Sequence, residues 1–245
     1  MKTIGIIPSR LKSTRLPDKA LIDIEGLPMI VHVFKRAELA SSLDEVIVAT
    51  DSKEIYDVVT SAGGKAVMTS PRHKTGTDRI AEVAGNVDCD IVVNIQGDEP
   101  LVDPEHINKV VEPLLKEEDV QTSVLVTPYS KKDSTSDIKA VLDLEGNILY
   151  CSRTDLPDTS RTGIDAMWKM CFIVPFRKEF LLEYTSWDQT PLERIEYNEY
   201  LRILEHGYKM RAVPVEDAEV SVDTPEDLEI VTEAMKKDTI KSKYM

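Results

Sequence analysis

The segment DIVVNI, residues 90–95, is strongly apolar and therefore predicts a buried β-strand. Two similar runs precede it, Ile4–Ile7 and EVIVAT at residues 45–50. Between these two runs, residues 29–39 carry apolar side chains at helical spacing after Pro28. Strands that are apolar throughout are typical of a parallel sheet covered by helices on both faces. The first 115 residues therefore predict an α/β fold.

The rest of the chain predicts further helices and strands. In the first half these are a helix from a Ser52 cap to Ala62, a strand at 65–68, and helices at 77–84 and 104–115. Beyond residue 120 the pattern changes to short strands joined by turns, at 120–127, 139–144, 147–151 and 167–176. A helix at 191–206, a strand at 210–215 and a helix at 225–236 complete the prediction. No linker interrupts the pattern, so we expect one domain, 1–245, with a β-rich subregion near 120–190 and a frayed polar tail at 236–245.

The composition excludes several classes of function. The chain has 30 basic and 44 acidic residues, a formal charge of −14, so most of its surface repels nucleic acid and anionic lipid. Its three cysteines form no disulfide framework or zinc motif, and its four histidines form no close ligand pair. The apolar runs are far shorter than a membrane span. We expect a cytoplasmic protein with a small-molecule substrate, no nucleic-acid partner and no membrane insertion.

A basic loop follows the first predicted strand. Residues 8–19, PSRLKSTRLPDK, have four basic residues and one acid from Arg10 to Lys19. Ligands of open α/β sheets bind at the carboxyl ends of the strands, where such a loop is suited to hold phosphates. The chain has neither GxxxxGK[ST] nor GxGxxG, so any phosphate would be held by a loop of another type. The alternative interpretation is a solvated loop that is basic by chance.

Two aspartates are candidate metal ligands. Asp98, in NIQGDEP at 94–100, directly follows the most apolar strand, and carboxylates beside phosphates suit Mg²⁺. A turn acid or a helix cap is its alternative role. Asp223 precedes a helix that starts with a proline, and its spacing to Glu226 favours a capping box over a metal ligand. The turn from Thr75 to Arg79 also opens a helix, and it either receives a base edge or an anionic group, or acts as a plain cap.

Six motifs together resemble the 3-deoxy-manno-octulosonate (Kdo) cytidylyltransferases. They are IIPSRLKSTRLPDKAL, GLPMIVHV, VIVATD, GTDRIAEV, VNIQGDEPL and VDTPEDL, and they occur in that order over most of the chain. The resemblance implies a Rossmann-like nucleotidyltransferase fold with a mostly parallel sheet and a small β-rich dimerisation and acceptor subregion. It also implies a cytoplasmic homodimer that uses Mg²⁺ and takes part in lipopolysaccharide biosynthesis. CTP and Kdo would give CMP-Kdo and pyrophosphate.

The resemblance also implies roles for individual residues. The catalytic residues would be Arg10, Arg15, Lys19 and Asp98. The nucleotide would contact Pro8, Ser9, Arg10, Ser13, Arg15, Lys19, Thr77, Asp78, Arg79 and Gln96. The acceptor would contact Arg79, Gln96, Ser152, Arg153, Met170, Glu193 and Glu196. Mg²⁺ would be held by Asp98 and Asp223, which raises the metal role of Asp223 above its capping role.

The chain departs from the family pattern mainly in the acceptor half. In WKMCFIVPFR, 168–177, Met170 and Val174 stand where the family has a histidine and a tyrosine, and Tyr200 replaces a glutamine. Asp18 and Ala20 replace a glycine and a proline beside Lys19. We therefore expect cytidylyl transfer to Kdo or a close relative. The alternatives are an amino-substituted or longer ulosonic acid, a phosphonate, or a nucleotide-binding regulator without catalysis.

Overall fold

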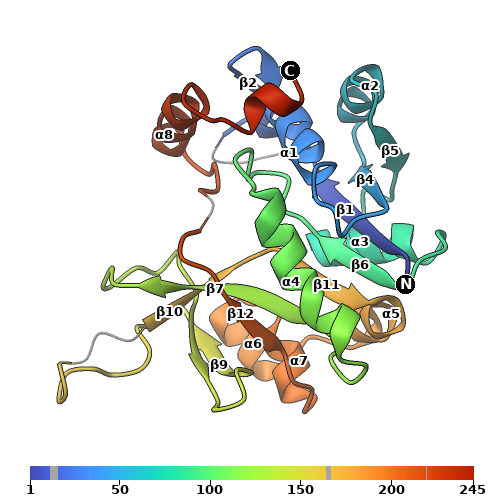
Figure 1. Ribbon diagram of the computed structural model, residues 1–245. Coiled ribbons are helices and arrows are strands. Elements are labelled where there is room, and N and C mark those ends of the chain that lie inside the picture. The colour runs from blue at the N-terminus through green and yellow to red at the C-terminus, as the bar shows by residue number, and fades with distance from the viewer. Residues whose placement is uncertain (12–15, 164–166, 219) are drawn as a thin grey trace. The chain divides into compact units, whose positions relative to one another are not determined.

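The computed structural model describes all residues except 12–15, 164–166 and 219 (Figure 1). The chain divides into two compact units: unit 1 comprises 1–108 and 219–245, and unit 2 comprises 109–218. The sequence pattern predicts one domain with a β-rich subregion near 120–190. Unit 2 is longer than that subregion because β12 (Arg211–Pro214) pairs with β7 (Ser123–Tyr129), which returns the chain to the sheet of unit 2.

Unit 1 contains a parallel sheet. Its strands are β1 (Thr3–Ser9), β4 (Glu45–Thr50), β5 (Lys65–Met68) and β6 (Ile91–Asn94), in the order β6-β1-β4-β5. Each neighbouring pair is parallel, and the central strands are almost fully buried, as their continuous apolar runs predict. The predicted α/β class with a parallel sheet is confirmed.

Helices accompany these strands along unit 1 (Figure 1). They are α1 (Met29–Ala37), α2 (Lys53–Ser61), α3 (Gly76–Ala84) and α8 (Pro225–Met235), with the 3₁₀ turns η1 (Lys19–Leu21) and η2 (Lys241–Lys243). A short hairpin pairs β2 (Asp23–Ile24) with β3 (Leu27–Pro28). Ser52 caps α2 as predicted, because its hydroxyl accepts a hydrogen bond from the Ile55 N–H at 3.3 Å. Helix α4 (Pro104–Lys116) begins in unit 1 and ends in unit 2.

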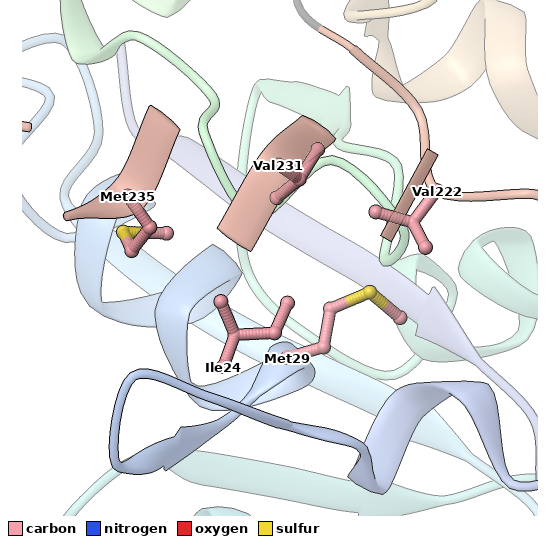
Figure 2. Close-up of a cluster of buried hydrophobic side chains, with 5 residues drawn as sticks. All are labelled: Ile24, Met29, Val222, Val231 and Met235. Atoms are coloured by element: carbon pink, nitrogen blue, oxygen red, sulfur yellow. The ribbon is translucent and has the colours of Figure 1, made fainter. Parts of the chain in front are cut away.

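An apolar cluster joins the C-terminal segment to the start of the chain within unit 1. It consists of the buried side chains Ile24, Met29, Val222, Val231 and Met235 (Figure 2). Two of these precede or begin α1, and the other three come from α8 and the segment before it. Burial of these side chains holds residues 222–235 against the N-terminal part of the same unit.

The tail at 236–245 is docked, so the expectation that it frays is wrong. Arg36 is 2% exposed and its Nη1 donates to Asp238 Oδ2 at 2.6 Å. His32 is fully buried between the Ile24 carbonyl, 2.6 Å from its Nε2, and the Tyr244 hydroxyl, 2.8 Å from its Nδ1. Burial lowers the pKa of His32. The contacts of Asp238 and Tyr244 join residues about 200 positions apart, so no local pattern indicates them.

Unit 2 is built on a mixed sheet with the order β12-β7-β10-β8-β9. Its remaining strands are β8 (Lys139–Leu142), β9 (Ile148–Ser152) and β10 (Met167–Cys171). The predicted strand at 167–176 is two strands, since a turn at Phe172 and Ile173 separates β10 from β11 (Val174–Arg177).

The predicted helix at 191–206 is also two elements, α6 (Pro191–Glu196) and α7 (Leu201–Glu205). The break occurs because Tyr197 adopts a left-handed conformation with φ of 53°. Helix α5 (Lys178–Ser186) was not predicted. Among the helices that the structure describes, none is both long and apolar enough to cross a lipid bilayer.

Candidate active site

The carboxyl ends of the parallel strands define one edge of unit 1. Two glycines lie against Pro8 at the end of β1. A Cβ atom on Gly97 would lie 2.9 Å from the Pro8 carbonyl oxygen, and one on Gly76 would lie 3.1 Å from Pro8 Cγ. Position 97 therefore requires glycine, since the obstructing atom is backbone. This packing brings the loop after β6 and the first turn of α3 to the end of β1.

Three of the predicted site residues meet at this edge. Lys19 Nζ lies 2.7 Å from Asp98 Oδ2 and 3.1 Å from Asp223 Oδ1. The three side chains are 16%, 30% and 40% exposed, respectively, so solvent reaches the group. The Val222 N–H donates to the Asp98 carbonyl at 2.9 Å, which holds the two acid-bearing segments together through the backbone. Residues 204 positions apart thus form one charged cluster.

Lys19 begins a short turn, η1, whose backbone is held by hydrogen bonds. Asp18 precedes it with φ of 52°, in the left-handed region that favours glycine and that aspartate tolerates better than most residues. A glycine, which the resemblance to the family implies at position 18, would adopt the same conformation without strain. Ala20 is buried and the Leu21 N–H donates to the Asp18 carbonyl at 2.8 Å, so the backbone on both sides of Lys19 is held.

Asp223 does not cap α8, and the capping box expected between Asp223 and Glu226 is wrong by one residue. The cap is Thr224, whose hydroxyl accepts from the Asp227 N–H at 3.2 Å. The Asp227 carboxylate accepts in return from the Thr224 N–H at 2.8 Å and from the Asp223 N–H at 3.0 Å. This arrangement leaves the Asp223 carboxylate to pair with Lys19.

The residues of α3 that were predicted to contact the nucleotide also make contacts within the protein. Thr75 caps the helix and Asp78 completes the capping box, in which its carboxylate accepts from the Thr75 N–H at 3.2 Å. Arg79 is 5% exposed, donates to the Thr69 hydroxyl and lies 3.4 Å from Asp51 Oδ2. Both partners follow the ends of neighbouring strands, so Arg79 ties the ends of β4 and β5 to α3.

The other predicted nucleotide residues lie at the same edge where the structure describes them. Arg10 is exposed, Pro8 and Gln96 are half-buried, and Ser9 and Thr77 are buried. The predictions for Ser13 and Arg15 fall outside the described residues.

Sequence reasoning missed a second link between the two acid-bearing segments. The buried Glu99 accepts a hydrogen bond from the Ser221 hydroxyl at 2.9 Å. Each residue lies within two positions of a predicted metal ligand, Asp98 or Asp223. This closeness in sequence to the predicted metal ligands was the only feature that could have indicated the contact. Together with the Val222–Asp98 backbone bond, this contact fixes the spacing of the two ligands.

Asp98 and Asp223 fit a divalent cation. Their oxygens already converge on one positive charge, and both side chains are partly exposed. Mg²⁺ is commonly bound by one or two carboxylates together with waters and phosphate oxygens. The described part of the chain contains no group of three or more His, Cys, Asp or Glu that suits a metal. A metal at Asp98 and Asp223 therefore needs the nucleotide or water to complete its coordination.

In unit 2, three of the predicted acceptor residues form one hydrogen-bonded cluster. The Glu196 carboxylate accepts from the Ser152 hydroxyl at 2.7 Å, the Arg153 N–H at 3.0 Å and the Tyr150 hydroxyl at 3.2 Å. Burial raises the pKa of Glu196, but these hydrogen bonds outweigh it and hold the pKa below its ordinary value. The Arg153 guanidinium donates to backbone carbonyls, including that of Glu196 at 3.0 Å.

The other two predicted acceptor residues of unit 2 are interior. Glu193 binds Arg202 through two hydrogen bonds of 2.6 and 2.8 Å, and both side chains are buried. Met170 is 1% exposed on β10, and Val174 is fully buried on β11. Tyr200, the third departure from the family pattern, is also buried and stacks on Phe172. The three departures therefore lie in the interior of unit 2.

A parallel sheet whose carboxyl edge carries Arg10, Lys19 and two converging carboxylates is the arrangement of a nucleotide-binding α/β protein. A family model described as cytidylyltransferase matches residues 4–213. The chain therefore belongs to the cytidylyltransferase family, as its motifs predicted.

Two named relatives and one solved structure show which cytidylyltransferases this chain is similar to. The chain is 42% identical to the 3-deoxy-manno-octulosonate cytidylyltransferase of Geotalea uraniireducens, over 97% of this chain and all of that protein. It is 41% identical to the same enzyme of Fusobacterium nucleatum, over 98% of this chain and all of that protein. Its fold matches CMP:2-keto-3-deoxy-manno-octonic acid synthetase complexed with CTP, with a TM-score of 0.94, 34% identity and coverage of 97% and 99% of the two chains.

Proposed function

We propose that this protein transfers CMP from CTP to Kdo and releases pyrophosphate. The observation that carries the proposal is the Lys19–Asp98–Asp223 cluster at the carboxyl edge of the sheet. It occurs in a chain about 40% identical, over nearly its full length, to enzymes named for this reaction. The protein is a CTP-dependent nucleotidyltransferase, and its acceptor is the sugar acid of those relatives.

In the reaction, the anomeric hydroxyl of the acceptor attacks the α-phosphorus of CTP. A bond forms between the sugar oxygen and the α-phosphorus, and the bond from that phosphorus to the oxygen bridging to the β-phosphate breaks. The hydroxyl proton passes to water, and pyrophosphate leaves. Such transfers depend on positioning and on neutralising charge more than on covalent help from the protein. Lys19 and the exposed Arg10 lie at the sheet edge where a triphosphate is expected, and they neutralise the charge that grows on the leaving pyrophosphate. Arg15 stays a prediction for the same role.

We propose Mg²⁺ as the divalent ion, held by Asp98 and Asp223. When bound, it supplies positive charge to the phosphate oxygens and lowers the cost of bringing an oxyanion toward phosphorus. The chain's own contribution is to keep the two carboxylates at a fixed spacing. The backbone bond from Val222 to Asp98 and the contact from Ser221 to Glu99 provide that spacing.

The acceptor contacts proposed in unit 2 are Ser152, Arg153 and Glu196, because these polar groups are already gathered and held in place. Met170 and Val174 are buried, so their departure from the family pattern alters the interior of unit 2. Arg79 and Gln96 stay predictions for the acceptor in unit 1.

We also propose that the protein is a cytoplasmic homodimer. Unit 2 exposes several large apolar side chains, among them Leu149, Ile195 and Tyr197, which an isolated chain would leave in water. Sedimentation should give a dimer that dissociates only on dilution. A monomer at every concentration would contradict this proposal.

A panel of acceptors tests the proposed substrate. Pyrophosphate release is measured with CTP and Mg²⁺ and, in turn, Kdo, an amino-substituted ulosonic acid, a longer ulosonic acid and a phosphonate. We expect Kdo to give the largest kcat/KM. A larger kcat/KM for another acid would replace Kdo as the acceptor. Protection of the protein against heat by CTP and Mg²⁺, with no product from any acid, would favour a regulator without catalysis.

A further inference from the structure

We propose that Lys19 is an internal counter-ion that occupies the metal ligands until metal and nucleotide arrive together, and so couples the binding of the two. The proposal rests on the function proposed above and deepens it. Its starting observation is that a single ammonium group contacts one oxygen of each proposed metal ligand, at 2.7 Å on Asp98 and 3.1 Å on Asp223.

The two carboxylates converge independently of the lysine. The Val222 N–H donates to the Asp98 carbonyl at 2.9 Å, and Ser221 bonds Glu99 on the neighbouring positions. Val222 itself is fully buried in the apolar cluster with Met29 and Val231 (Figure 2). Two negative charges are thus held close to each other by backbone and packing, and their repulsion requires a nearby cation.

Lys19 supplies that cation in the chain without ligands. Its backbone is fixed by the turn between Asp18 and Leu21, while its side chain is a flexible four-carbon stem. The ammonium can therefore leave the carboxylates without any change in the fold.

Lysine and a divalent ion compete for these carboxylates. An ammonium and a metal ion on the same two oxygens would be neighbouring positive charges in a half-buried site, and this repulsion opposes joint occupation. A metal ion that arrives alone must displace Lys19 from both of these carboxylates and offers it no anion in exchange. A metal ion that arrives with a triphosphate brings that partner, because a phosphate oxygen can accept from the displaced ammonium.

The consequence is positive coupling between metal and nucleotide. Metal alone binds weakly, and each ligand raises the affinity of the other by the same factor. The site is thereby protected from holding a metal ion without its substrate. Lys19 acts on metal affinity as a positioning residue in the empty protein and contacts the phosphates only after the exchange.

Binding of Mn²⁺, followed by electron paramagnetic resonance with and without CTP, tests this account. Lys19→Met keeps the length of the side chain and removes its charge. We expect this variant to bind Mn²⁺ in the absence of CTP about tenfold more tightly than the original protein, or more. We also expect CTP to improve its Mn²⁺ affinity by a smaller factor. Lys19→Arg, which keeps the charge, should retain weak binding of Mn²⁺ alone and strong coupling.

The outcomes separate this proposal from the proposed function. Unchanged Mn²⁺ affinity and unchanged coupling in Lys19→Met would overturn the counter-ion role while the metal site stands. Absence of Mn²⁺ binding with CTP in the original protein, or undiminished binding in Asp98→Asn, would overturn the metal site itself. If Lys19→Met folds poorly, Lys19→Gln is used in its place. Its melting temperature should rise more with added Mn²⁺ than that of the original protein, and an equal rise would contradict the proposal.

Discussion

In unit 1, Asp98 and Asp223 have side chains 30% and 40% exposed and share one lysine, whereas in unit 2 Glu193 is 4% exposed and holds Arg202 in a two-bond pair. Both groups are acidic residues paired with a basic one, and both carry residues that the motifs assign to the active site. The difference lies in access to solvent. We infer that the pairs of unit 1 exchange partners during function, and that the Glu193–Arg202 pair stabilises the fold.

The largest effect is expected from Asp98→Asn. The substitution removes one of two carboxylates proposed for the metal and retains the size of the side chain. We expect kcat to fall about a thousandfold, equivalent to about 4 kcal/mol of transition-state stabilisation. Pyrophosphate release measures the loss, and thermal melting serves as the control for folding. Activity close to that of the original protein would remove Asp98 from the metal site.

Glu193→Gln should lower the stability of the fold and leave the activity of the folded protein nearly unchanged. It leaves the Arg202 guanidinium buried without its carboxylate, and breaking a buried pair in this way costs about 3 kcal/mol of unfolding free energy or more. Urea unfolding measures the cost. The matched control in unit 2 is Glu145→Gln, because the Glu145–Lys209 pair is about 70% exposed on both sides and its loss should leave the free energy of unfolding nearly unchanged.

The Glu193 variant also sharpens the contrast between the two units. At a temperature where it is folded, we expect its kcat and KM to be close to those of the original protein. A raised KM for the sugar acid with unchanged stability would instead show that Glu193 contacts the acceptor. It would contradict the inference that the Glu193–Arg202 pair only stabilises the fold.

Lys19→Ala should lower kcat by about a hundredfold, since the negative charge on the departing pyrophosphate is larger in the transition state than in bound CTP. Steady-state kinetics with varied CTP separates kcat from KM. An effect on KM alone would mean that Lys19 binds the ground state and the transition state equally.

The smallest effect concerns Asp137 in unit 2. Its carboxylate accepts from Tyr129 and Ser134, at 2.6 Å each, and pairs with Lys169 at 2.8 Å. Burial raises the pKa of Asp137, but the hydrogen bonds from Lys169, Ser134 and Tyr129 outweigh it and hold the pKa well below the ordinary value of 3.8. The folded chain therefore binds this proton less readily than the unfolded chain, so the stabilisation is present above pH 3.8 and is lost as the pH falls further.

Asp137→Asn tests this pH dependence. Urea unfolding of the original protein should lose about 1 kcal/mol more between pH 6 and pH 3 than unfolding of the variant. Equal losses in the two proteins would show that Asp137 does not contribute to acid sensitivity.

The α/β fold of unit 1 was predictable because its strands are short apolar runs between helices with clear caps. Strands β4 and β5 begin and end at the predicted residues, since turn and cap residues adjoin them on both sides. Features of unit 2 were less predictable. Strand 167–176 contains its own turn, and helix 191–206 is interrupted by a left-handed residue that is not glycine.

The candidate site was predictable to the extent that motifs name residues. Lys19, Asp98 and Asp223 were named, and the structure joins them. Their direct ion pairing was not foreseen, because it depends on where side chains far apart in the sequence meet. The capping box was misplaced by one residue because Asp223 and Thr224 both suit a cap, and the backbone selects between them. Likewise, the interior position of Met170 depends on pairing between β10 and β7, which local patterns do not show.

The central claim is that this chain forms CMP-Kdo from CTP. Its most direct test is mass spectrometry of the products formed from CTP, Mg²⁺ and Kdo, with pyrophosphate measured in the same reaction. The account predicts one CMP-Kdo for each pyrophosphate released, and formation of both products about a thousandfold more slowly with Asp98→Asn. Pyrophosphate without CMP-Kdo, or CTP left unconsumed by folded protein in the presence of Kdo, would contradict it.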